Sequence, residues 1–126
     1  ACYCGRNGCI ERFVSGPALS ADYQRVSGLR LGAEDIIAAA TGGDAGCEDA
    51  LLRYESRLAR ALASVINFLD PEVIVLGGGL SNTERLYESL PRLWRSFIYG
   101  KGTSTRLVKA AHGDSSGVLG AARLWS

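Results

Sequence analysis

The sequence lacks methionine entirely and has little histidine or proline, with one and three residues respectively among 126. Because translation starts with methionine, we expect the chain to be a processed or truncated part of a longer product. No apolar run approaches the roughly 18 residues that a membrane-spanning helix needs. The first residues also lack the apolar core of a signal peptide. These absences predict a cytoplasmic protein with no membrane partner.

An excess of one charge sign is also missing. The 14 basic and 13 acidic residues leave a net charge of +1. Proteins that bind nucleic acid or an anionic membrane surface usually carry a basic excess, so neither partner is expected here. The chain is 47% hydrophobic and 21% charged, which is typical of a globular domain and not of a disordered segment.

The residue pattern predicts one helix-rich α/β domain with two strands. Pro91 predicts a kink or break in one helix, and the apolar run Val73 to Leu76 is typical of a strand buried on both faces. Since two strands make a poor sheet alone, we expect upstream sequence to supply more. Helices are predicted over residues 10–15, 18–26, 33–40, 47–69, 83–98 and 115–125, and strands over residues 72–76 and 105–110.

The longest predicted helix, residues 47–69, has one apolar face at helical spacing. This face is predicted to lie in the core, and consists of Leu51, Tyr54, Leu58, Leu62, Val65, Ile66 and Leu69.

Three of the four cysteines fall in the first nine residues, as Cys2-x-Cys4-x4-Cys9. The glycines between them allow the positive φ angles that a tight loop around an ion needs. Thiolates favour tetrahedral zinc with four ligands, so the fourth ligand would be Cys47, His112 or a residue before Ala1. A disulfide pair or simple burial are the alternatives, although disulfide frameworks are typical of secreted chains.

Two further features are candidate binding residues. Gly77, Gly78 and Gly79 follow the first strand, where glycines let a ligand approach the backbone and N–H groups can receive a phosphate. A plain tight turn explains these glycines equally well. Glu11 lies two residues after Cys9, where a carboxylate could bind sugar hydroxyls or act as a base, or simply be a solvated helix residue.

The segment Cys2-x-Cys4-Gly5-x-x-Gly8-Cys9-x-Glu11 resembles the zinc-binding signature of the ROK family of bacterial sugar kinases and repressors. Later motifs follow in the order typical of that family, at residues 70–79 and 113–122, so the resemblance covers essentially the whole chain. The segments 2–5, 22–23, 80–82 and 112–117 are most similar to the fructokinase (manno-fructokinase) branch. The N-acetylglucosamine kinases of the family are close behind.

The resemblance implies that residues 1–126 form the C-terminal lobe of an actin-like ATPase (ribonuclease H-like) fold, with a zinc-binding loop at residues 2–11. It implies that Cys2, Cys4 and Cys9 bind a structural Zn²⁺ ion and that Glu11 contacts the sugar. It also implies that Gly77, Gly78 and Gly79 lie beside the nucleotide.

The implied activity is ATP-dependent phosphorylation of a hexose with Mg²⁺, and the resemblance favours fructose as the hexose. The family's catalytic Asp, its first phosphate-binding loop and a zinc-binding His would all lie before Ala1. No catalytic residue is therefore expected in this chain, which alone would be inactive. The alternatives are an N-acetylglucosamine or glucose kinase of the same family and a sugar-responsive transcriptional repressor. Family members often form dimers, so a homodimer is one option, and the sequence leaves the oligomeric state open.

Overall fold

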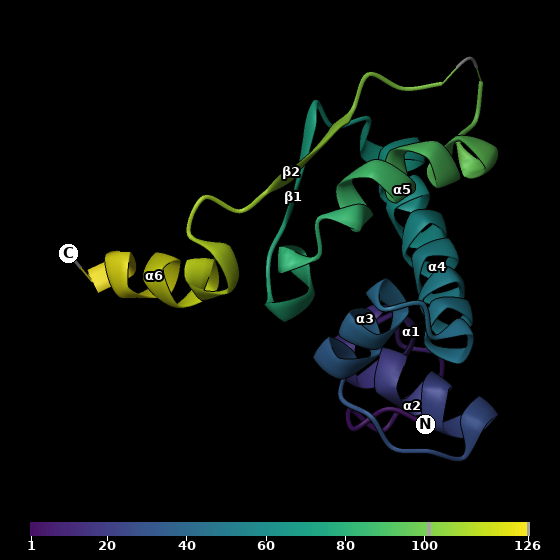
Figure 1. Cartoon of the computed structure of the whole chain (residues 1–126). Helices are drawn as coiled ribbons and strands as arrows, with labels where there is room; N and C mark the ends of the chain where they lie inside the picture. The colour runs from purple at the N-terminus through teal and green to yellow at the C-terminus, as the bar shows by residue number, and fades with distance from the viewer. Residues whose placement is uncertain (101, 126) are drawn as a thin grey trace. The chain divides into compact units, whose positions relative to one another are not determined.

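The computed structural model describes residues 1–100 and 102–125, and the chain divides into two compact units, Ala1–Ala61 and Leu62–Ser126 (Figure 1). The boundary falls inside helix α4, Ala45–Leu69. Among the described residues, no helix combines the length and the apolar character needed to cross a membrane.

The first unit is helical and contains α1 (Glu11–Val14), α2 (Gly16–Ser27), α3 (Ala33–Thr41) and the first part of α4. The Ser15 hydroxyl caps α2 by accepting a hydrogen bond from Ala18 N at 3.2 Å, and Gly28, with φ 76°, ends this helix. The Asp44 carboxylate accepts from Cys47 N at 2.8 Å in the first turn of α4. The most deeply buried large side chains of the first unit are Leu19, Ile36, Cys47, Leu51 and Glu55.

The second unit contains a parallel pair of strands, β1 (Val73–Leu76) and β2 (Arg106–Lys109), with Val73 opposite Arg106. Between them lie the 3₁₀ turn η1 (Gly79–Asn82), helix α5 (Arg85–Leu93) and the 3₁₀ turn η2 (Trp94–Phe97). After β2 the chain forms η3 (Gly113–Ser115), α6 (Ser116–Ala122) and η4 (Arg123–Trp125). This helix-rich α/β architecture with few strands confirms the sequence prediction.

The prediction that the first strand is buried on both faces is wrong for this structure. Val75 in β1 is 57% exposed, and its neighbours Val73, Ile74 and Leu76 are only half-buried. In the described residues β1 pairs with β2 alone, and one neighbouring strand cannot enclose it.

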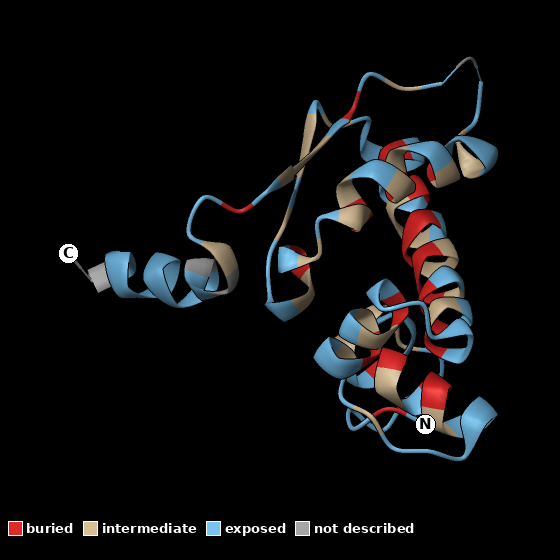
Figure 2. Cartoon of the chain, in the orientation of Figure 1, coloured by how far each residue is buried: buried red, intermediate tan, exposed pale blue. Residues whose placement is uncertain are grey.

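The predicted apolar face of α4 is partly correct. Leu51, Tyr54, Leu58 and Ile66 are buried, but Val65 and Leu69 are 41% and 65% exposed. Figure 2 shows buried residues along one face of α4. In its second half that face runs through Ala59, Ala63 and Ile66, at helical spacing. Alanines with 0% and 1% exposure therefore take core positions that the prediction gave to larger side chains.

The prediction that Pro91 kinks or breaks the helix is only partly correct. Helix α5 continues through Pro91 to Leu93 and becomes the 3₁₀ turn η2 at Trp94. Trp94 N still bonds to Leu90 O, and Leu86, Leu90 and Trp94 are buried.

Candidate functional site

The structure brings the three N-terminal cysteines together in one loop. The Sγ atoms of Cys2, Cys4 and Cys9 all lie within 4.8 Å of one another, and those of Cys4 and Cys9 are 3.4 Å apart. A tight turn produces this arrangement, because Gly5 N donates to Cys2 O at 3.0 Å and Cys2 N donates to Arg6 O at 2.8 Å. Gly5 and Gly8 have φ angles of 82° and 75°, as expected for glycines that let the loop close.

The geometry of the cluster fits a tetrahedral zinc ion. Zn–S bonds of about 2.3 Å place two sulfur ligands about 3.8 Å apart, and the observed sulfur spacing is close to that distance. All three thiols are free, and of the three only Cys2 is buried.

The thiols of Cys4 and Cys9 are hydrogen-bonded to each other. A backbone hydrogen bond at Arg6, together with the bond to Cys9, lowers the pKa of Cys4. Hydrogen bonding with Cys4 raises the pKa of Cys9 to about 11. Of the two thiols, Cys4 therefore loses its proton more readily than Cys9.

Cys47 lies apart from the cysteine cluster. This residue is 1% exposed in the first turn of α4, and its thiol interacts with Tyr23 and Asp44. In the part of the chain that the structure describes, no fourth His, Cys, Asp or Glu joins the cysteine cluster. His112 is exposed in the loop after β2, in the second unit.

Glu11 is the first residue of α1 and is tied to the cysteine loop. Arg12 N donates to Cys9 O at 2.9 Å, so the helix starts directly on the loop. The Tyr3 hydroxyl, from within the cysteine motif, donates to Glu11 Oε2 at 3.0 Å. This bond to a carboxylate raises the pKa of Tyr3. The Glu11 side chain is exposed, so it is accessible to a hydrophilic ligand.

The glycine turn lies at the carboxyl end of β1. Only Gly78 of the three has a positive φ, at 85° with ψ 175°, a region that is essentially restricted to glycine. A Cβ atom at Gly77, Gly78 or Gly79 would meet no heavy atom within 4 Å. The backbone of this turn is therefore open to an approaching group.

A second glycine-containing turn lies beside the first. Ala110 N donates to Leu76 O at 3.0 Å and Leu76 pairs with Lys109, so the two parallel strands end at the same level. Gly113 has φ 58°, and a Cβ there would lie 3.9 Å from Asn82 Oδ1. The carboxyl ends of the two strands thus carry both turns on one edge, which is where open α/β sheets bind ligands.

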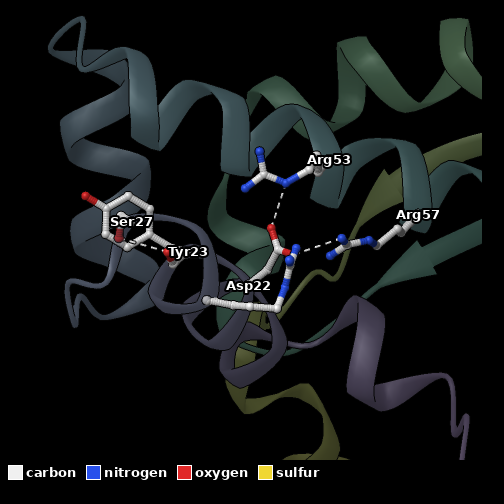
Figure 3. Close-up of polar contacts among 6 residues, drawn as sticks. Asp22, Tyr23, Ser27, Arg53 and Arg57 are labelled. Carbon is white, nitrogen blue, oxygen red and sulfur yellow. Dashed lines mark hydrogen bonds and ion pairs between the residues drawn. The ribbon is translucent and has the colours of Figure 1, made fainter.

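A buried ion-pair cluster in the first unit was missed by the sequence prediction (Figure 3). The Asp22 side chain, only 6% exposed, accepts hydrogen bonds from Arg25 at 3.0 Å, Arg53 at 2.8 Å and Arg57 at 2.9 Å. Burial alone would raise the pKa of Asp22, but the three guanidinium groups outweigh it and lower the pKa to about 2. The spacing of four between Arg53 and Arg57 places both on one helix face and is the signal that could have indicated the cluster.

Comparison with known proteins adds to these observations. The ROK family model matches residues 1–126. The N-acetyl-D-glucosamine kinase of Aliivibrio fischeri is 42% identical over 123 residues, which is 98% of this chain and 41% of that protein. The chain therefore spans less than half the length of this curated relative.

Two solved structures are similar to nearly the whole chain. The ROK hexokinase of Thermus thermophilus has a TM-score of 0.81 at 31% identity, over 97% of this chain and 41% of that one. A ROK family glucokinase from Streptomyces griseus, solved with glucose and AMPPNP, has a TM-score of 0.84 at 25% identity, over 96% and 45%. The predicted actin-like ATPase fold is thereby confirmed. Because the family model matches from the first to the last residue, this chain belongs to the ROK family.

Proposed function

We propose that this chain is the C-terminal lobe of an ATP-dependent hexose kinase. The observation that carries the proposal is the open backbone of Gly77, Gly78 and Gly79 at the carboxyl edge of the strands. Only Gly78 has a conformation that requires glycine, so the chain's own geometry explains one glycine of three. Space left for a nucleotide explains the other two. The relatives named hexokinase, glucokinase and N-acetyl-D-glucosamine kinase support this proposal.

In this proposal the residues of the chain bind and orient, and the transfer chemistry needs groups from elsewhere. Glu11 accepts hydrogen bonds from sugar hydroxyls, and the glycine turn contacts the nucleotide. ATP supplies the phosphoryl group and Mg²⁺ neutralises its charge. The acidic base that accepts the sugar hydroxyl proton is expected in the N-terminal lobe, so this chain alone would be inactive.

Zinc has a structural role in the proposal. Cys2, Cys4 and Cys9 would hold it, and it would fix the loop on which α1 and Glu11 begin. Solvent, His112 or a residue from another part of the protein would complete the shell. Metal analysis that finds one zinc per chain, together with a loss of thermal stability in chelator, would support this role. Absence of zinc and unchanged folding in chelator would count against it.

The identity of the sugar is a finer question. The motifs at residues 2–5 and 112–117 favour fructose. However, N-acetyl-D-glucosamine kinases and a glucokinase are among the relatives, so N-acetylglucosamine or glucose fits the comparisons better than fructose. A homodimer and a cytoplasmic location remain predictions.

The experiment that tests the activity is a coupled ADP-release assay on the full-length protein. Fructose, glucose, mannose and N-acetylglucosamine are each supplied with Mg·ATP, and we expect turnover of at least one hexose. No turnover of any hexose would refute the kinase. Sugar-dependent release of DNA by the same protein would instead favour the repressor of the family.

A further inference from the structure

A chain of hydrogen bonds connects helix α5 to the glycine turn. The Tyr87 hydroxyl, on α5, donates to the backbone carbonyl of Ser81 at 2.7 Å. Ser81 is 2% exposed and belongs to η1, directly after the glycines. Its hydroxyl donates to Gly78 O at 2.7 Å, and its backbone N donates to the same oxygen at 3.0 Å.

These bonds fix the orientation of one peptide group in the turn. Because the peptide unit is planar and trans, two donors on the Gly78 carbonyl also determine the direction of the Gly79 N–H on its other side. The φ and ψ of Gly78 lie in a sparsely populated region, and such conformations persist only when the surroundings hold them. Ser81 holds the turn directly, and Tyr87 holds Ser81.

We propose that Tyr87, acting through Ser81, is a positioning residue for nucleotide binding by the Gly77–Gly79 turn. This inference rests on the proposed function, because it assumes that the turn contacts the nucleotide. Tyr87 itself is half-buried on α5, and its hydroxyl bonds to the backbone of Ser81 and not to the glycines. Removal of its hydroxyl therefore loosens the turn without removing any atom that contacts a ligand.

A purely structural role for Tyr87 makes a different prediction. Loss of a hydrogen bond that serves only stability lowers the melting temperature and the fraction of active enzyme, and so lowers kcat. It leaves the KM values for ATP and hexose unchanged. A positioning role raises the KM for ATP and the Kd for Mg·ADP, and leaves the KM for hexose unchanged, because Glu11 and the cysteine loop are not affected.

The test compares Tyr87→Phe, Ser81→Ala, the double variant and wild type in the full-length protein. Tyr99→Phe is the matched control, since it removes the same hydroxyl from a side chain that is 92% exposed. We expect the KM for ATP and the Kd for Mg·ADP to rise about three- to ten-fold in Tyr87→Phe, the range for one lost neutral hydrogen bond. The double variant should show less than the product of the single effects, because both residues hold one turn.

Two results separate the inference from the proposed function. If wild type binds Mg·ADP and Tyr87→Phe binds it as tightly as Tyr99→Phe, the positioning role is overturned and the kinase proposal stands. If wild type binds no Mg·ADP by calorimetry, the nucleotide site is overturned and this inference with it.

Discussion

Replacement of Asp22 by asparagine should destabilise the protein by about 2 kcal/mol at neutral pH, because the carboxylate is the common partner of three guanidinium groups. The pKa of Asp22 falls from 3.8 to about 2. At roughly 1.4 kcal/mol per pKa unit, this difference corresponds to about 2–3 kcal/mol in favour of the folded charged form, before solvent screening is considered.

Adding the three bonds at the magnitude of full charge-assisted hydrogen bonds would give several kcal/mol more. The net effect is smaller, about 2 kcal/mol, because the three partners are partly solvated. Arg25 is 67% exposed, and Arg53 and Arg57 are each 33% exposed, so solvent screens part of the attraction. The buried carboxylate also loses hydration on folding, and this cost offsets part of the gain.

The effect should depend on pH in a defined direction. A depressed pKa stabilises the folded state above the unfolded value of 3.8, and this stability is lost as the pH falls toward about 2. Urea unfolding of wild type and Asp22→Asn should therefore differ fully at pH 7 and converge near the lower value. Asp49→Asn, at an exposed position of α4, is the control and should match wild type. A difference at pH 7 below about 0.5 kcal/mol, or one that does not shrink in acid, would refute the reasoning.

Three further predictions concern the proposed sites. Cys9→Ser should abolish the zinc binding that metal analysis measures. It should also lower the melting temperature by as much as a chelator lowers that of wild type, and a zinc-free protein with unchanged stability would contradict this. Gly78→Ala should lower the free energy of unfolding in urea by about 1–3 kcal/mol, because it forces a side chain into a backbone region that only glycine occupies readily. Gly79→Ala should leave this free energy unchanged and weaken Mg·ADP binding in calorimetry. Glu11→Gln should raise the KM for hexose about ten-fold or more and leave that for ATP unchanged, since hydrogen bonds to a charged group are the stronger kind; equal changes in both would exclude a sugar-binding role.

The sequence predicted the elements well because their limits depend on local chemistry. Ser15, Gly28 and Pro91 determine where helices begin, end or change, and each acts within a few residues of its own position. The cysteine cluster was equally predictable, because its members lie within one short loop. Whether a segment forms a strand or a helix followed from the spacing of its hydrophobic residues.

What could not be predicted depends on contacts between distant residues. Asp22 and Arg57 are 35 positions apart, so the i, i+4 spacing of the arginines indicates a shared helix face but not which acid it binds. The exposure of Val75 depends on which strands flank β1, which its own apolar run does not specify. The Tyr87 hydroxyl reaches Ser81 only because η1 turns the chain back toward α5, and tyrosine on an amphipathic helix gives no sign of this.

The glycines after β1 show what the structure adds to a question that the sequence leaves open. A plain tight turn and a ligand site both predict glycine after a strand. A turn alone needs glycine only where φ is positive, which holds for Gly5, Gly8 and Gly78 but not for Gly77 or Gly79. A side chain at these last two positions would meet no other atom of the described chain within 4 Å. Neither backbone conformation nor packing within the described residues therefore requires them to be glycine, which is what the proposed nucleotide contact predicts.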